Sequence, residues 1–207
     1  MTTVLAPPPP DLAEFDDEAE VPERQRMTVD EFLTLPLDDG VDRDLLFGEV
    51  WEEPMTVRTR LHSGGEGLIT TRLQQQVWAN GDRHRVCSGE AGVVLREEES
   101  AAGLDIVVIR REDYDESERR QTTYFECVPM MVVEVLSPTN VHEKIMLKIE
   151  ACQSAGVPLI WLVDPRRRTV TAYRVGHKPV LFEGEETINA DPAVPNFAMP
   201  TAKLFDE

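Results

Sequence analysis

The chain has 207 residues, of which 41% are hydrophobic, so it can bury a sizeable core and is not disordered throughout. Its net charge of −18 argues against tight, general DNA binding, because Lys and Arg are needed to neutralise phosphates. The apolar runs stay well below the roughly 20 residues of a membrane helix, and the N-terminus lacks a signal peptide. These features predict a cytoplasmic protein with no membrane partner.

Residues 1–26 differ in composition from the rest of the chain. They contain four consecutive prolines and seven acidic residues, against Arg24 and Arg26 as the basic ones. Such a segment buries too little apolar area to offset the entropy of ordering it. We expect a disordered, Pro-rich acidic tail, which a basic partner could bind, followed by one domain over 27–207. Without the tail, the domain still carries a net charge of roughly −13.

The first half of the domain reads as a helix, a strand and a longer helix. Thr28 and Glu31 fit a capping box that opens a short helix ending near Leu35. The pattern over 44–51 predicts a strand. Leucine and valine residues recur at helical spacing over 61–79, and Asn80-Gly81 is typical of a helix end.

The second half of the domain alternates strands with one clear helix. Strands are predicted at 84–88, 92–96 and 104–109, then a loop or irregular helix at 111–124. Residues 130–136 and 157–163 read as buried strands, separated by a helix that begins within 137–140 and runs to about Ala155. A hairpin over 169–175 and 179–183 follows. The pattern predicts an α/β protein with a mixed sheet.

Two carboxylates interrupt apolar strands. Asp105 lies within Leu-Asp-Ile-Val-Val-Ile, and Glu134 within Met-Val-Val-Glu-Val-Leu. An ionised carboxylate buried without partners is very costly, so each must be paired, bound to a metal, neutral or exposed. Pairing with an arginine or a place at a wet strand end explains either acid alone. It explains two acids followed by a lysine-bearing helix less well.

That helix carries Lys144 and Lys148, one turn apart beside an apolar stripe. Like charges at this spacing repel slightly unless an acid lies nearby. Periodicity does not distinguish either lysine from an ordinary solvated one. The three cysteines are far apart, and their spacing predicts reduced thiols and no zinc site.

Several motifs together resemble the Uma-two family of putative restriction endonucleases, in the PD-(D/E)XK nuclease superfamily. They are Glu-Val-Leu-Ser-Pro at 134–138, Gly-Val-Pro at 156–158 and Trp-Leu-Val-Asp-Pro at 161–165, with Lys148 between the first two. Residues 27–33 are similar to the family's opening helix and 47–50 to its first strand. Asp105 matches the acid of the PD motif, and His62 lies where a histidine is usual.

The resemblance implies a restriction endonuclease-like core, a mixed sheet flanked by helices, here with an extra C-terminal hairpin. It implies that Asp105 and Glu134 bind Mg²⁺ or Mn²⁺ and that Lys148 assists phosphodiester hydrolysis in DNA. Leu136 occupies the position of the motif's lysine, which in this family is thought to lie on the following helix. Hence Lys148 is the candidate.

Secondary candidates are Glu49 and Asp44, as an additional acid near the metal, and His62, for substrate contact or proton transfer. Each has an ordinary structural reading that is at least as well supported. The sequence departs from the family pattern at Leu104, where proline is usual, at Cys152, where tyrosine is usual, and at Lys144, where an acid is frequent.

Three functions remain open at this point. The first is a metal-dependent endonuclease, with Arg58 and Arg60 near the site as contacts to the DNA backbone. The second is a binding or regulatory module that keeps the nuclease fold without cleaving, which the acidic composition favours. A structural oligomer explains neither buried acid and ranks last. A homodimer is compatible with the first two.

Overall fold

The computed structural model describes residues 24–206 except 38, 82 and 139. Residues 1–23 of the predicted tail, 1–26, therefore lie outside the described residues. The last residues of the tail already pair with the domain. The Val50 N–H donates to the Gln25 carbonyl at 2.8 Å, and Arg26 forms an ion pair with Glu49 of β2.

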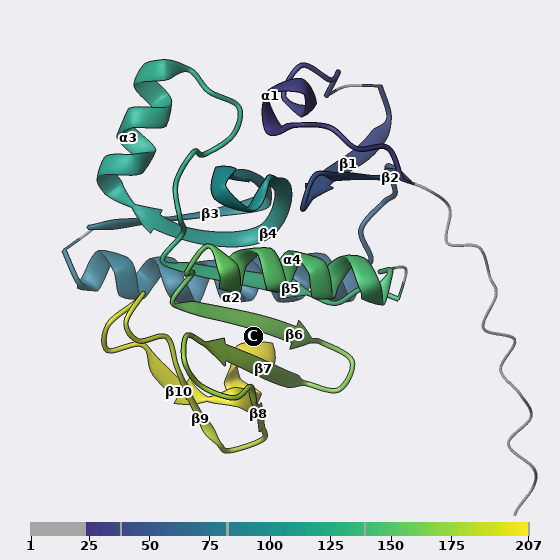
Figure 1. Ribbon diagram of the computed structural model, residues 1–207. Helices are drawn as coiled ribbons and strands as arrows, with labels where there is room; N and C mark the ends of the chain where they lie inside the picture. Colours follow the sequence, from purple (N-terminus) through teal and green to yellow (C-terminus); the bar gives the residue numbers. More distant parts are fainter. Residues whose placement is uncertain (1–23, 38, 82, 139, 207) are drawn as a thin grey trace, which may run out of the picture.

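The helices and strands follow one another along the chain as Figure 1 shows. The helices are α1 (Val29–Phe32), α2 (Arg60–Ala79), α3 (Arg111–Arg120) and α4 (His142–Ser154), with 3-10 turns η1 (Arg96–Glu98) and η2 (Thr201–Phe205). The strands are β1 (Val41–Leu46), β2 (Glu49–Pro54), β3 (His84–Leu95), β4 (Ser100–Arg110), β5 (Met131–Val135), β6 (Leu159–Asp164), β7 (Thr169–Arg174), β8 (Val180–Glu183), β9 (Thr187–Asn189) and β10 (Ala198–Pro200).

Within the described residues, β1 to β8 form one 8-stranded sheet, in the order β2-β1-β4-β5-β6-β7-β8 with β3 also paired to β4. β5 and β6 are parallel and the other pairs antiparallel, so the predicted mixed sheet is confirmed. The predicted C-terminal hairpin is β7–β8, which extends this sheet. The additional β9–β10 pair was not predicted.

Helices cover both faces of the sheet. Successive side chains of a strand point to opposite faces, so each face has its own hydrophobic cluster. Met131, Val133 and Val135 of β5 pack in a cluster with α2 and the C-terminal segment. Val132, between them in sequence, packs in a cluster with α4. A strand buried on both faces must be apolar at nearly every position, which explains why β5 could be predicted from the sequence.

The hairpin β1–β2 corrects the prediction of one strand over 44–51. The chain reverses at Phe47 and Gly48, whose φ angles are 52° and 77°. Glycine adopts such an angle without steric cost. The apolar pattern continues on both sides of this glycine, so the sequence did not indicate a turn between two strands.

Two further predictions were wrong in detail. The strands expected at 84–88 and 92–96 are one strand, β3, with an irregularity between Ser88 and Ala91. The segment expected to be a loop or irregular helix is the regular helix α3 over its first ten residues. In contrast, the capping box at Thr28 is present. No helix of the described residues is long and apolar enough to cross a membrane.

Candidate active site

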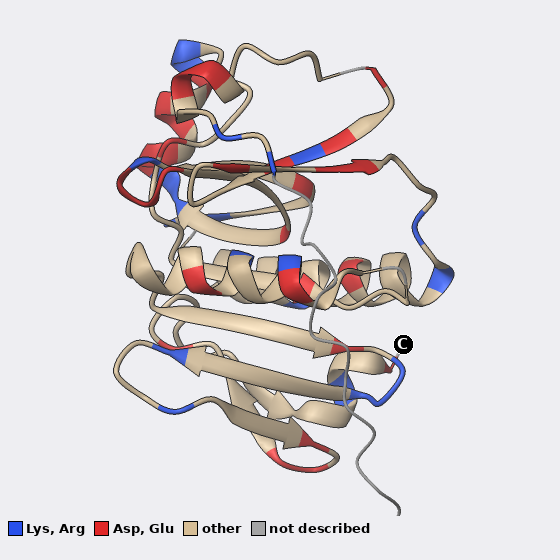
Figure 2. Ribbon diagram, turned by 45° about the vertical axis from the view of Figure 1, so that its right-hand side comes forward, with Lys and Arg blue, Asp and Glu red and all other residues tan. Residues whose placement is uncertain are grey.

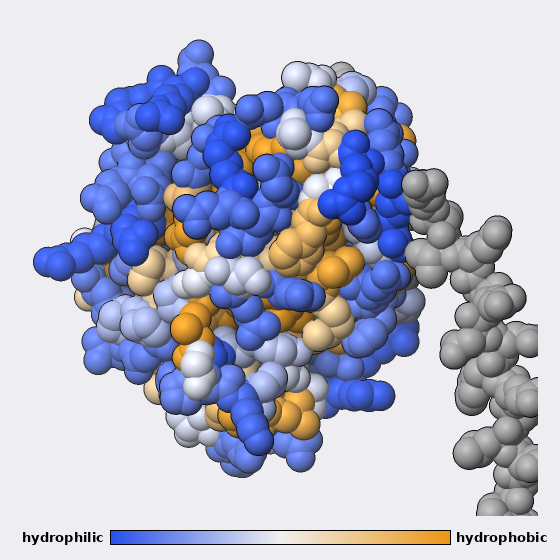
Figure 3. Space-filling view, in the orientation of Figure 1, coloured by the Kyte–Doolittle hydropathy of each residue, from blue (hydrophilic) through white to orange (hydrophobic). Residues whose placement is uncertain are grey.

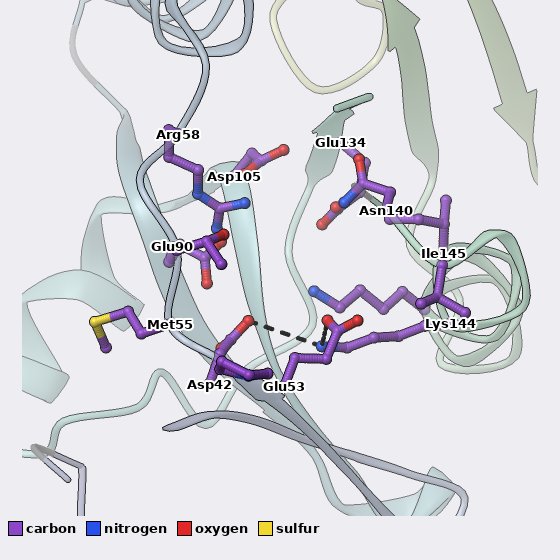
Figure 4. Close-up of a pocket in the computed structure, with 14 residues that line it drawn as sticks. Asp42, Glu53, Met55, Arg58, Glu90, Asp105, Glu134, Asn140, Lys144 and Ile145 are labelled. Carbon is purple, nitrogen blue, oxygen red and sulfur yellow. Dashed lines mark hydrogen bonds and ion pairs between the residues drawn. The ribbon is translucent and has the colours of Figure 1, made fainter. Parts of the chain in front are cut away.

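A cleft of about 490 Å³ lies where the β1–β2 hairpin, β4, β5 and α4 approach one another. Figure 4 shows charged side chains entering it from both sides. Its acidic lining residues are Asp42, Glu53, Glu90, Asp105 and Glu134, and its basic ones are Arg58, Lys144 and Lys148. The three residues proposed from sequence as catalytic, Asp105, Glu134 and Lys148, thus line one cleft.

The cleft forms because β1 and β5 share one edge of β4 and leave a gap between them. β1 pairs with β4 at Ala101, and β5 pairs with it only from Ile106 onward. Inside the gap, the backbone groups of Gly103 form hydrogen bonds with side chains instead of with a neighbouring strand. Its N–H donates to Asp44 Oδ1 at 2.9 Å, and its carbonyl accepts from Lys148 Nζ at 2.7 Å.

A bulge on the other edge of β4 orients Asp105. β3 has two residues, Gly89 and Glu90, where β4 has only Asp105, and both have positive φ angles of 85° and 62°. An extra residue interrupts the alternation of side chains between the sheet faces. The Asp105 carboxylate, 4% exposed, contacts His62 of α2, with 3.2 Å between Asp105 Oδ2 and His62 Nε2.

Two further contacts fix this part of the site. The Val135 N–H donates to Asp105 Oδ2 at 2.7 Å, in place of a backbone carbonyl. Near the other ring nitrogen of the imidazole, Glu66 Oε2 lies 3.8 Å from His62 Nδ1. Glu66 was not a candidate from the sequence. Its position one helical turn after His62 could have indicated that the two side chains lie on the same face of the helix.

Glu134 is buried and incompletely paired. It is 4% exposed, and its Oε1 has no hydrogen-bond partner among the described residues. Burial raises the pKa of Glu134 to about 8, with Asp105 and Asp44 adding to the increase and Lys148 opposing it. Unless a metal ion is bound beside it, this carboxyl group is therefore mostly protonated at neutral pH.

Asp44 pairs with both lysines of α4. Its Oδ2 lies 3.1 Å from Lys148 Nζ and 2.9 Å from Lys144 Nζ, which also donates to Glu53 Oε2 at 2.9 Å. Burial by itself would lower the pKa of Lys148, but Asp44 and then Glu134 raise it above its ordinary value. Lys148 is thus positively charged and cannot act as a base at neutral pH.

The same two lysines determine the charge of Asp44. Burial by itself would raise the pKa of Asp44, but Lys148 and Lys144 lower it below its ordinary value. Asp44, a secondary candidate for the metal, is therefore an anion already engaged by two cations. The sequence could not indicate this, because β1 and α4 are about a hundred residues apart.

The remaining candidates lie around the cleft rather than at its centre. His62 is buried behind Asp105, at 1% exposure. Glu49 does not line the cleft and instead pairs with Arg26, at 2.9 Å between Oε1 and Nη1. Arg58 does line the cleft, where it forms an ion pair with Glu90.

Comparisons with known proteins give a family and a fold. Residues 29–202 match the model of the Uma2 family, described as putative restriction endonuclease. The chain is also similar to a crystal structure described as a putative nuclease belonging to DUF820, from Anabaena variabilis. That structure has 23% sequence identity and a TM-score of 0.74, and the match covers 86% of this chain and 97% of the other. No curated protein matches the chain.

Proposed function

Because this chain belongs to the Uma2 family of putative restriction endonucleases, we propose that it is a cytoplasmic, divalent-cation-dependent endonuclease acting on DNA. The observation that carries this proposal is the convergence of Asp105, Glu134 and Lys148, from β4, β5 and α4, on one cleft. Two carboxylates that can hold a metal ion and a fixed positive charge are groups that can promote phosphodiester hydrolysis.

The residues present fit a hard divalent cation. Asp105 and Glu134 supply carboxylate oxygens, the ligands that Mg²⁺ and Mn²⁺ prefer. The unpartnered Oε1 of Glu134 and the raised pKa of this group indicate a carboxyl group whose negative charge Lys148 compensates only in part. When bound, such a cation polarises a phosphate oxygen and lowers the pKa of an attacking water.

The chain's own residues supply orientation and positive charge. Asp105 is oriented by a hydrogen bond from the Val135 N–H and by its contact with His62. Lys148 is fixed by Asp44 and by the Gly103 carbonyl, so its ammonium group is in place before substrate binds. A fixed positive charge stabilises the negative charge that develops on the phosphate oxygens in the transition state.

Substrate binding is expected to be weak and sensitive to salt. Acidic residues outnumber basic ones in the cleft lining. On α3, acidic and basic residues occur together (Figure 2). Hydrophilic residues cover most of the face shown in Figure 3. DNA affinity therefore depends on a few local cations, Arg58 among them, whose effect is screened by salt.

Cleavage of single- and double-stranded DNA at low salt, with Mg²⁺ or Mn²⁺, tests the proposal. We expect cation-dependent cutting by the wild type and a loss of roughly 100-fold or more in Asp105→Ala and Lys148→Ala. Matched controls are Glu49→Gln, outside the cleft, and Lys178→Ala, an exposed lysine. Cutting that persists in both cleft variants, with their folds intact by circular dichroism, would rule out this site.

A second function is favoured by one observation. Both cleft lysines already form ion pairs with Asp44, so their charge is partly neutralised before any phosphate enters. A nuclease-fold module that binds nucleic acid or protein without cleaving it would then be the better account. Cation binding in the folded wild type without any cleavage would select this second function.

A further inference from the structure

His62, Glu66 and Asp105 form a cluster on the side of Asp105 that faces α2. His62 and Glu66 are four residues apart, so they lie on the same face of the helix. One ligand atom from each of the three side chains lies within 4.8 Å of the others. Glu66 is oriented by the Gly89 N–H of the bulge, which donates to its Oε1 at 2.6 Å and leaves Oε2 facing His62.

The imidazole of His62 is incompletely paired in this cluster. The side chain is 1% exposed, and its Nδ1 has no hydrogen-bond partner among the described residues. A neutral imidazole has one N–H donor and one nitrogen lone pair. A carboxylate oxygen lies near each ring nitrogen, 3.8 Å from Nδ1 and 3.2 Å from Nε2, so either tautomer leaves a lone pair near a carboxylate oxygen. Two facing acceptors repel unless a positive charge lies between them.

We propose that His62, Glu66 and Asp105 form a second cation site, which takes a divalent transition metal such as Co²⁺ or Zn²⁺. One imidazole nitrogen and two carboxylate oxygens are its protein ligands. The separation of 3.2 Å between His62 Nε2 and Asp105 Oδ2 is compatible with two adjacent ligands at about 2.1 Å from one ion. Asp105 has two oxygens and can serve both this site and the cleft.

The ligand set distinguishes this site from the cleft. An imidazole nitrogen favours later transition metals such as Co²⁺ or Zn²⁺, whereas Mg²⁺ and Mn²⁺ prefer oxygen ligands. The cleft presents carboxylates without a histidine at its surface. The Glu66 side chain is 16% exposed, so solvent reaches the second site from that direction. This site does not depend on the proposed nuclease activity, because it requires only that a cation binds.

A proton is the alternative source of positive charge. A protonated His62 would donate to Asp105 and face Glu66, and the cluster would then be a hydrogen-bonded chain that only positions Asp105. The two possibilities differ in one measurable respect. A metal bound by imidazole changes the spectrum of the metal and of the histidine, whereas a proton gives no metal signal.

The test is a titration of the untagged, chelator-treated protein with Co²⁺, followed by visible absorption and by NMR of the histidine ring protons. With excess Mg²⁺ present to occupy the cleft, we expect one Co²⁺ to bind with paramagnetically shifted histidine signals. His62→Gln should lose these signals, and Glu66→Gln should weaken binding by roughly 10-fold or more. Glu134→Gln, which changes only the cleft, should retain the shifted histidine signals and the Co²⁺ affinity of the wild type.

His177→Gln and Glu150→Gln are the matched controls, because both residues are exposed, and both should bind Co²⁺ as the wild type does. If His62→Gln fails to fold, Glu66→Gln carries the test, since Glu66 lies nearer the surface. Absence of shifted histidine signals in the wild type, or signals unchanged in Glu66→Gln, would overturn the proposal. Failure of the nuclease proposal has a different signature, namely intact Co²⁺ binding without cleavage.

Discussion

At the scale of single residues, Glu134 and Lys148 show how burial alters ionisable groups in opposite ways. Glu134 is driven toward its neutral form, because burial and nearby carboxylates raise its pKa to about 8. Lys148 remains charged, because the Asp44 carboxylate offsets its desolvation. A neutral acid beside a fixed cation can accept a divalent ion only by giving up its proton.

Binding of Mg²⁺ or Mn²⁺ to the cleft should therefore release a proton at neutral pH. Below pH 8 Glu134 is mostly protonated, so cation affinity should rise with pH, by up to about 10-fold per unit, and level off above pH 8. Calorimetry in buffers of different ionisation enthalpy measures the released proton. Glu134→Gln should bind the cation more weakly and release no proton. Equal proton release by this variant and the wild type would contradict the assignment.

Asp44→Asn should destabilise the protein and impair catalysis. It removes the anion that pairs with two largely buried lysines, and breaking such a pair costs about 3 kcal/mol. Urea denaturation measures the loss, and cleavage should fall by about 10-fold or more because Lys148 is no longer fixed. Asp42→Asn is the control. Asp42 lies 3.8 Å from Lys144 and is 33% exposed, so this change should cost less than about 1 kcal/mol.

At the scale of elements, irregular backbone on both edges of β4 creates the site. In the gap between β1 and β5, the Gly103 N–H donates to Asp44 and the Gly103 carbonyl accepts from Lys148. The bulge at Gly89 and Glu90 turns Asp105 toward α2 and orients Glu66. Strand irregularities next to functional residues reposition side chains that regular pairing would place elsewhere.

Glycines in α2 and in the bulge should respond oppositely to alanine. Gly64 and Gly67 lie in α2, where a methyl group added at either position would meet open space, so Gly67→Ala should stabilise by about 0.5–1 kcal/mol. Gly89 has a φ of 85°, so Gly89→Ala should cost about 1 kcal/mol and also reduce cleavage by displacing Asp105 and Glu66. Thermal denaturation and the cleavage assay measure the two effects. Equal behaviour of both variants would contradict the role given to the bulge.

At the scale of the whole molecule, net charge opposes the proposed substrate. The chain carries −18, and residues 1–23 contribute seven acidic residues and no basic ones. Removing this segment reduces the net negative charge to −11 without removing any described contact. Long-range repulsion of DNA phosphates should decrease accordingly.

A chain beginning at Arg24 should therefore bind DNA more tightly than the full chain at low salt. The difference should disappear as salt rises above about 0.2 M, where screening is strong. Fluorescence anisotropy with a labelled oligonucleotide over a salt series measures it. Equal affinities at low salt would show that the segment does not affect substrate binding.

The sequence by itself determined the fold family and most of the elements. Motifs such as Glu-Val-Leu-Ser-Pro at 134–138 and the apolar run of β5 are local, and a strand buried on both faces must be apolar throughout. The family resemblance is confirmed over residues 29–202. The roles of Asp105, Glu134 and Lys148 stay predictions, although the structure brings the three residues to one cleft.

Only the tertiary structure decided the surroundings of these residues. The pairing of Asp44 with two lysines of α4, the approach of Glu66 to His62 beside Asp105, and the opening of the sheet at Gly103 join distant parts of the chain. Such contacts depend on strand register and on the bulge in β3, which the residue pattern of one segment does not encode. Local periodicity specifies which residues are buried, and the packing of the elements decides which buried charges meet.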